Sequence, residues 1–243
     1  MTVTEERRNL KKELKKAQRI VFFTGAGVST DSGIPDFRSQ DGLYNQQYAY
    51  PPEEILSHRF FQTKTEEFYA FYRKKMLYLD VQPSIVHNFI KEYEQSGKDV
   101  SVITQNIDGL HQLAGSKRVY ELHGSVLRNY CVNCHQFYPV EYIVNSKGIP
   151  LCTKCHHIVK PDVVLYGEAL AEDVLWQSIE ALKKADTCVV LGTSLAVYPA
   201  ANLLNYFLGD TLILINREQT PYDKYANMVI HDEFKNIFKD IMI

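Results

Sequence analysis

Four short apolar runs, each followed by small or polar residues, constrain the fold of this chain more than any other feature. They occupy 20–24, 100–104, 187–191 and 211–215, and the first of them shows no alternation of polar and apolar residues. Such runs are typical of strands buried on both faces of a parallel sheet, and helical segments separate them along the chain. The sequence therefore predicts an α/β fold with a parallel sheet, ending in a short strand at 228–230.

The first run leads into the sequence GAGVS at 25–29, which has little side-chain bulk. Glycines at such a turn let the backbone approach a ligand and leave N–H groups exposed, which suits a pyrophosphate, although a tight turn without a ligand explains them equally well. Thr30 stands where the dinucleotide fingerprint G-x-G-x-x-G has its third glycine. No strand ends in an acid about 20 residues further on, where a dehydrogenase has the carboxylate that binds the ribose. We therefore expect a nucleotide site that does not serve hydride transfer.

Polar residues also follow the second run, in the sequence QNIDGLH at 105–111, and His123 follows a short strand at 119–122. Ligands of parallel α/β sheets bind outside the carboxyl ends of the strands, where these side chains would meet. Amide and carboxylate groups there can hold a ribose or a carboxamide, although capping and loop roles are the simpler alternative. For His123 a structural role and a role as general base are equally well supported.

Four cysteines form two pairs with the spacing C-x-x-C, namely Cys131 with Cys134 and Cys152 with Cys155. Seventeen residues separate the pairs, which is typical of a four-thiolate zinc site. Four thiolates leave no open position on the metal, so we expect a structural Zn²⁺. The fifth cysteine, Cys188, lies in an apolar run and is expected to be an inert buried thiol.

Composition excludes several classes of protein. The chain has 243 residues, 45% hydrophobic and 23% charged, with a formal net charge of -2. No block of like charge indicates a nucleic-acid or lipid surface, and the lysines at 11–16 are typical of a solvated helix face. The polar first residues do not resemble a signal peptide, and no apolar run reaches the roughly 18 residues of a membrane span. We expect a cytoplasmic, monomeric protein with no direct nucleic-acid or membrane partner.

Together these segments resemble the sirtuins, the NAD-dependent protein lysine deacylases, in their bacterial form. The shared motifs are GAGVS, GIPDFR, TQNIDGLH, ELHG, the two C-x-x-C pairs, VVLYGE, GTSLAVYP and a late IN, in the family's order from about 20 to 230. The resemblance implies a Rossmann-like parallel-sheet domain with an inserted small domain, which combines a helical module and a four-cysteine zinc module. The implied boundaries are 1–38, 83–124 and 163–243 for the Rossmann-like domain, 39–82 for the cofactor loop and helical module, and 125–162 for the zinc module.

The resemblance also assigns functions to individual residues. It makes His123 and Asn106 catalytic, with Asn106 orienting the ribose. The residues implied to bind NAD are Gly25, Ala26, Gly27, Thr30, Phe37, Arg38, Gln105, Ile107, Asp108, Gly192, Thr193, Ser194, Asn216 and Ile230. Those implied to bind the substrate peptide by strand pairing are Val163, Tyr166, Gly167 and Val197.

The implied reaction removes an acyl group from a protein lysine with NAD as co-substrate, giving nicotinamide, 2′-O-acetyl-ADP-ribose and free lysine. The alternative is protein mono-ADP-ribosyl transfer at the same NAD site, and a nucleotide sensor without activity is a third possibility. His123 favours deacylation, because pure ADP-ribosyl transfer does not require a ribose hydroxyl to be deprotonated. An acidic acyl group would need a Tyr-x-x-Arg pair in the helical module. Tyr72 and Lys75 are a weak substitute for it, so we favour acetyl-lysine substrates.

Overall fold

The computed structural model describes residues 2–37, 42–43, 49–239 and 241. Its larger sheet contains parallel strands in the order β3-β2-β1-β7-β8-β9, which confirms the predicted α/β fold. The strands are β1 (Arg19–Thr24), β2 (Asp99–Thr104), β3 (Val119–Glu121), β7 (Thr187–Leu191), β8 (Thr211–Ile215) and β9 (Met228–Ile230). The chain extends the sheet from β1 first through β2 and β3, and then returns to the other side of β1 with β7. The strand order therefore reverses between β1 and β7, the position at which α/β sheets bind ligands.

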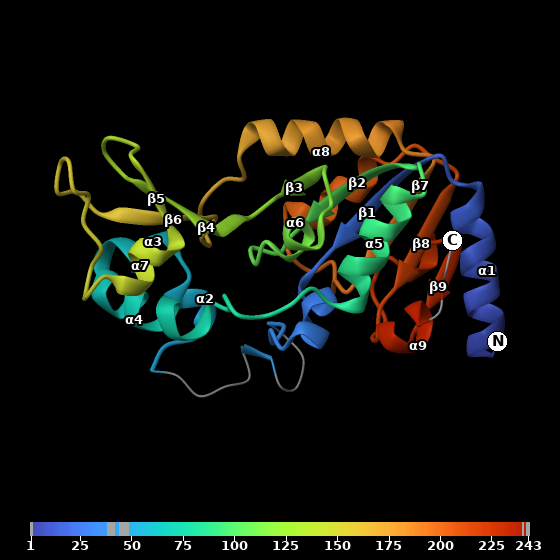
Figure 1. Cartoon of the computed structure of the whole chain (residues 1–243), viewed down its shortest axis with the longest axis horizontal. Coiled ribbons are helices and arrows are strands. Elements are labelled where there is room, and N and C mark those ends of the chain that lie inside the picture. The colour runs from blue at the N-terminus through green and yellow to red at the C-terminus, as the bar shows by residue number, and fades with distance from the viewer. Residues whose placement is uncertain (1, 38–41, 44–48, 240, 242–243) are drawn as a thin grey trace.

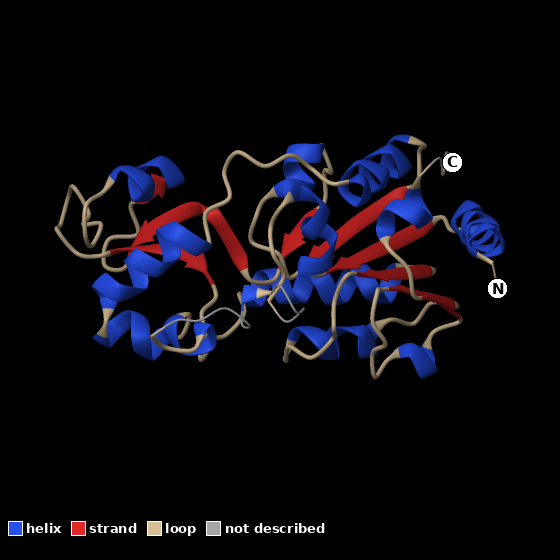
Figure 2. Ribbon diagram, turned by 90° about the horizontal axis from the view of Figure 1, so that it is seen from below, coloured by secondary structure: helices blue, strands red, loops and turns tan. Residues whose placement is uncertain are grey.

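Helices cover both faces of this sheet (Figures 1 and 2). Adjacent residues of β1 face opposite sides, so that Phe22 packs in one core and Phe23 in the other. This explains the mostly apolar sequence of β1, since both of its faces are buried. One core contains α1 (Val3–Lys16), α5 (Ile85–Gln95) and α9 (Phe234–Phe238), and the other contains α8 (Glu172–Lys184) and the 3₁₀ helix η3 (Ala200–Tyr206).

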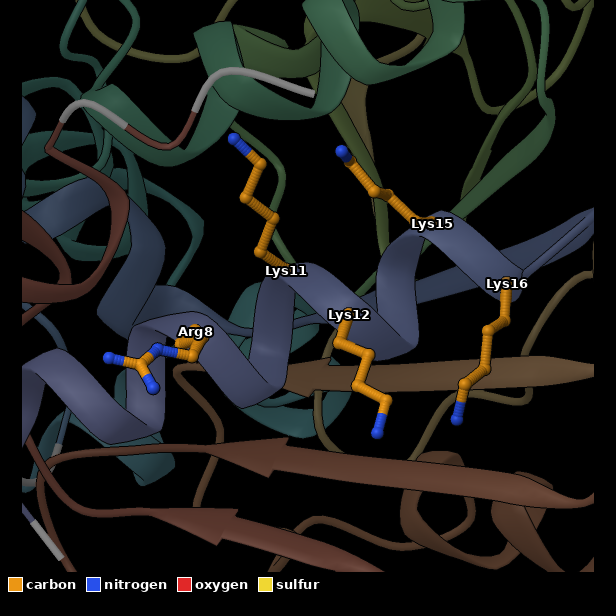
Figure 3. A pocket seen from close by; sticks show the side chains of 5 residues that line it. All are labelled: Arg8, Lys11, Lys12, Lys15 and Lys16. Atoms are coloured by element: carbon orange, nitrogen blue, oxygen red, sulfur yellow. The ribbon is translucent and has the colours of Figure 1, made fainter.

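Helix α1 combines a buried face with a basic one. Leu10 and Leu14 are buried against the sheet core, and Thr2 and Glu5 form a capping box at the first turn. Figure 3 shows that Lys11 and Lys15 extend from one side of the helix and Lys12 and Lys16 from the other; with Arg8 they line an open pocket. Apart from Lys11, which is half-buried, these side chains are exposed, as the sequence predicts for a solvated helix face.

A second, antiparallel sheet has the order β5-β4-β6 and lies apart from the first, on the left in Figure 1. One hydrophobic core joins this sheet to helices from residues 52–75, and Arg73 donates hydrogen bonds to Ile143 O at 2.9 Å and Gly148 O at 2.6 Å. The helical module and the zinc module are therefore packed as one unit, which we call the second unit. Its elements are α2 (Pro52–Ile55), α3 (His58–Thr63), α4 (Thr65–Lys75), β4 (Gly124–Cys131), β5 (Phe137–Pro139), α7 (Val140–Asn145) and β6 (Val159–Val163).

Short elements and turns complete the fold. Strand β6 ends at Val163, and a turn closed by the hydrogen bond from Glu168 N to Leu165 O follows. The 3₁₀ helix η3 follows Pro199, and the 3₁₀ helix η1 (Ala26–Ser32) follows β1. Two further short helices are α6 (Leu110–Ala114) and η4 (Asp223–Tyr225). Among the described helices, none has both the length and the apolar composition needed to cross a membrane.

Candidate functional site

A cavity of about 1030 Å³ lies where the carboxyl ends of β1, β2, β7 and β8 face the second unit. Most of the residues that the sequence predicts to form the site line this cavity. They are Gly25, Ala26, Gly27, Thr30, Phe37, Gln105, Asn106, Ile107, Asp108, His123, Val163, Tyr166, Gly167, Gly192, Thr193, Ser194, Val197 and Asn216. Ile230 instead has its side chain in the sheet core, and its carbonyl oxygen accepts the N–H of Asn216. Arg38 lies outside the described residues.

The glycines after β1 are required by contact with the turn after β7. A Cβ on Gly25 would lie 2.6 Å from the Cβ of Thr193, and one on Gly27 would lie 2.8 Å from the Cα of Gly192. The N–H groups of Gly25 and Gly27 donate to Leu191 O at 3.0 Å and Gly192 O at 2.9 Å. The expectation that these two N–H groups point outward is therefore wrong, because both bond to the neighbouring strand end. Their contribution is to let the two turns meet at the cavity floor.

Ser29 connects the two polar side chains that follow β2. Its hydroxyl donates to Asp108 Oδ2 at 2.7 Å and accepts from Asn106 Nδ2 at 3.1 Å. Leu110 N–H bonds the other carboxylate oxygen of Asp108 at 2.9 Å. Burial raises the pKa of Asp108, and the hydrogen bonds from Leu110 and Ser29 oppose that shift. Asn106 and Asp108 are consequently fixed in orientation before any ligand enters.

Ser29 is a site residue that the sequence analysis missed. The only signal for it is that the GAGVS motif ends in a hydroxyl residue. Nothing in the sequence links that hydroxyl to Asp108, which lies 79 positions further along the chain.

His123 lies at the end of β3, with one ring nitrogen bonded to the protein. Its Nδ1 is 2.9 Å from the main-chain oxygen of Gln105. A carbonyl oxygen can only accept, so Nδ1 carries the hydrogen and Nε2 keeps its lone pair. Burial lowers the pKa of His123, and the hydrogen bond with Gln105 opposes this in part. The ring is therefore a neutral base at neutral pH, with Nε2 as its basic atom.

Gln105 joins the ends of three strands at the cavity floor. Its N–H donates to Thr24 O at 3.0 Å, and its side-chain amide donates to Thr193 Oγ1 at 2.9 Å. Since its carbonyl holds His123, one residue links the turns after β1 and β7 to the histidine. The polar strand ends predicted to share one site are thus brought together here.

Two buried histidines lie behind this floor. His87 Nδ1 accepts from Ser84 N–H at 3.1 Å, and Ser84 Oγ donates to Val28 O at 2.7 Å. His111 Nε2 is 3.0 Å from Thr24 Oγ1, and the two imidazole rings are 4.5 Å apart. Burial lowers the pKa of His87 to about 4 and that of His111 well below its ordinary value, so both rings are neutral at neutral pH.

The wall predicted to pair with a peptide is partly occupied by the protein itself. Tyr166 N–H donates to Leu56 O at 2.9 Å, and Tyr166 O accepts from His58 N–H at 2.9 Å. Both backbone groups of Tyr166 are therefore used, and Gly167 beside it has a positive φ of 89°. Gly167 and Val197 remain as cavity-lining positions on the two opposing segments.

The four paired cysteines lie close together as free thiols in the second unit. Their sulfur atoms all lie within 4.8 Å of one another, with 3.4 Å between Cys131 and Cys155 and 3.5 Å between Cys134 and Cys152. A tetrahedral zinc with bonds of about 2.3 Å places its sulfurs about 3.8 Å apart. The arrangement therefore fits Zn²⁺, and four thiolates complete its coordination. Cys188 is buried in β7, as predicted.

Comparison with known proteins gives consistent matches over the whole chain. A family model described as Sir2 family matches residues 25–199. An NAD-dependent protein deacetylase of Clostridium acetobutylicum is 50% identical over 245 residues, covering 100% of both chains. A protein of the same name from Staphylococcus epidermidis is 44% identical, covering 96% of this chain and 95% of that protein.

Solved structures also match closely. The complex of Sir2 with a p53 peptide and NAD+ has a TM-score of 0.84 at 37% identity, covering 98% of this chain and 95% of that chain. Sir2Tm bound to a propionylated peptide has a TM-score of 0.86 at 36% identity, covering 98% and 97%.

Proposed function

The chain belongs to the Sir2 family and is an NAD-dependent protein deacetylase, and we propose that His123 and Asn106 carry its reaction. Bound NAD supplies the ADP-ribosyl group that receives the acyl group as nicotinamide leaves. The observation that supports the proposal best is that His123 Nδ1 bonds Gln105 O while the ring lines the cavity. This leaves Nε2 as the base for a ribose hydroxyl, and Asn106, bonded to Ser29, orients that ribose.

The proposed NAD site follows the cavity floor from β2 to β8. The nicotinamide and its ribose lie against Gln105, Ile107 and Asp108, where amide and carboxylate groups suit a carboxamide and hydroxyls. The turns at 25–30 and 192–194 contact the phosphates, and Asn216, with Ile230 behind it, contacts the adenosine half. Phe37 covers the reacting carbon against water, and Arg38 belongs to the same proposed set.

The proposed substrate is a peptide that contains an acyl-lysine. It enters between the segment at 163–167 and Val197, because both line the cavity that contains His123. Backbone pairing supplies affinity with little demand on the peptide sequence. We assign that pairing to Gly167 and Val197 and give Val163 and Tyr166 side-chain contacts, since the backbone of Tyr166 is already bonded. Acetyl-lysine is the proposed preference.

Zn²⁺ is proposed to act as a structural element held by the four cysteines. Two of these, Cys131 and Cys152, are also part of the hydrophobic core of the second unit. The metal thereby fixes the wall of the cavity rather than taking part in the reaction. We propose in addition that the enzyme works as a cytoplasmic monomer without nucleic-acid or membrane partners. The division at 38, 82, 124 and 162 is proposed as its domain organisation.

Mass spectrometry tests the function directly. Wild type and His123→Ala are incubated with NAD and an acetyl-lysine peptide, and we expect equal amounts of free peptide and O-acetyl-ADP-ribose from wild type alone. A succinyl-lysine peptide tests the acyl preference in the same assay. NAD consumption with an unchanged peptide and an ADP-ribosylated protein would favour the alternative, ADP-ribosyl transfer. NAD left untouched with every acyl peptide would overturn the assignment of the site.

A further inference from the structure

His231 is bonded through both of its ring nitrogens, just beyond β9. Nδ1 is 3.0 Å from the main-chain oxygen of Asn216, and Nε2 is 2.9 Å from Asp223 Oδ2. A carbonyl and a carboxylate are both acceptors, so the ring nitrogens are the atoms that can donate to them. The ring thus bridges the end of β8 to η4.

The carboxylate in this bridge is itself held in place. Asp223 Oδ1 accepts from Thr220 N–H at 3.0 Å and from Thr220 Oγ1 at 2.7 Å. Since both carboxylate oxygens are bonded, Asp223 presents Oδ2 to His231 in a defined direction. The exposed fractions of the His231 and Asp223 side chains are 31% and 22%, so solvent reaches this contact only in part.

Other charged groups near this segment have partners of their own. Asp232, the next residue, accepts from Glu233 N–H at 2.7 Å and from the Asn236 amide at 2.8 Å. Arg217 lies 4.0 Å from Glu218. Among the described residues, Asp223 is the charged group that bonds to the His231 ring.

The other end of the bridge is a residue of the cavity wall. Asn216 N–H donates to Ile230 O at 3.1 Å, and its side-chain amide donates to Glu218 O at 2.9 Å. With one amide hydrogen bonded, Oδ1 and the second amide hydrogen are the groups that Asn216 can offer to a ligand hydroxyl. Asn216 lines the cavity, whereas His231 lies behind it.

We propose that His231 is a positioning residue for NAD, whose ring, bonded at both nitrogens, holds Asn216 in the orientation that receives the adenosine ribose. This rests on the proposed function, which assigns Asn216 to the adenosine half of NAD. His231 contacts no substrate, so its effect is confined to the binding of NAD and ADP-ribose. The peptide site and the transfer step at His123 lie at other strand ends and do not depend on it.

The test compares His231→Leu, which removes both donors, with His231→Arg, which keeps N–H donors and a permanent positive charge. We expect His231→Leu to raise the Kd for ADP-ribose, measured by calorimetry, and the KM for NAD by about ten-fold, the effect of losing one hydrogen bond to a carboxylate. The kcat and the KM for the acetyl-peptide stay at their wild-type values. His231→Arg restores ADP-ribose affinity to within about two-fold of wild type.

His58→Leu is the matched control, because it breaks a second histidine–carboxylate contact, with Glu168 at 2.8 Å, away from Asn216. It is expected to bind ADP-ribose like wild type. Unchanged ADP-ribose affinity in His231→Leu would overturn the proposal. So would equal weakening in the Leu and Arg variants together with a lowered Tm in both, because that pattern describes a purely structural residue.

ADP-ribose binding separates the failure of this inference from that of the proposed function. If wild type binds ADP-ribose with the expected variant pattern but makes no O-acetyl-ADP-ribose, the deacetylase assignment fails and the positioning role stands. If wild type deacetylates and the Leu variant shows no defect in ADP-ribose binding or in KM for NAD, the positioning role alone fails. If wild type does not bind ADP-ribose at all, both are overturned.

Discussion

His123 and Gln105 are joined by a hydrogen bond of 2.9 Å between the imidazole Nδ1 and the main-chain oxygen. Because the acceptor belongs to the backbone at the end of β2, a change in the Gln105 side chain does not remove it. The bond fixes both the tautomer of His123 and the orientation of its ring. The sequence alone supports a structural and a catalytic role for His123 equally well. The hydrogen bond at Nδ1 makes Nε2 its basic atom.

The first prediction concerns the pH dependence of deacetylation. The base must be unprotonated, and burial lowers the pKa of His123. The acid limb of kcat/KM, measured from about pH 5 to about pH 8, is therefore expected below the ordinary histidine value of about 6.5. Replacement by alanine should reduce the rate by about 10²- to 10⁴-fold. An acid limb above about 6.5, or a His123→Ala variant that keeps its activity, would contradict the assigned base.

The second prediction concerns Ser29. Ser29→Ala removes a hydrogen bond to the carboxylate of Asp108 and leaves the Asn106 amide without that acceptor. Loss of a bond to a charged group in a buried site is expected to lower kcat/KM for NAD by about ten-fold. Ser32→Ala is a matched control in the same 3₁₀ helix, because Ser32 Oγ is buried without a hydrogen-bond partner among the described residues. Equal effects of the two substitutions would rule out the proposed orienting role.

The large sheet was predictable because both of its faces are buried. The neighbouring strands β1 and β7 are apolar over most of their length, and that pattern can be recognised without tertiary information. The second unit was less predictable. Strand β5 has three residues, too few to show a period, and its position depends on pairing with β4 and on the nearby cysteine cluster.

The candidate site likewise has features that the sequence predicts and features that it does not. The sequence places His123, Asn106 and Asp108 at strand ends, and parallel pairing is enough to bring strand ends together. It does not predict that the Gly25 and Gly27 N–H groups bond to β7, or that the backbone of Tyr166 is already paired with residues 56 and 58. Those contacts depend on the relative placement of distant turns, which is determined by packing rather than by local sequence.

The third prediction concerns the removal of zinc. Chelation should increase amide hydrogen exchange in β4, β5 and α7, because the cysteines contribute to the core of the second unit, while β1 and β2 stay protected by the separate core of the large sheet. Cys134→Ser should have the same effect at lower chelator concentrations. Cys188→Ala, in β7, should keep the wild-type zinc content. Protection that survives chelation in β4 would show that the unit does not need the metal.

The last prediction concerns stability in acid. His87 is buried and neutral, and its pKa of about 4 lies below the value of about 6.5 expected in the unfolded chain. Between these two values the unfolded state binds more protons than the folded state, so the free energy of unfolding falls as the pH is lowered from about 6.5 to about 4. His87 alone accounts for about 3 kcal/mol of that loss. His111 adds to it, because burial also lowers its pKa.

Urea unfolding at about pH 7.5 and about pH 5 measures this loss, with His87→Gln as the comparison. A glutamine oxygen can still accept from Ser84 N–H, and it does not titrate in this range. The variant is expected to lose less stability than wild type between the two pH values, even if it is less stable at the higher one. Parallel stability curves for wild type and variant would show that groups other than His87 cause the acid sensitivity. The comparison therefore assigns the pH dependence to the buried ring independently of any effect on catalysis.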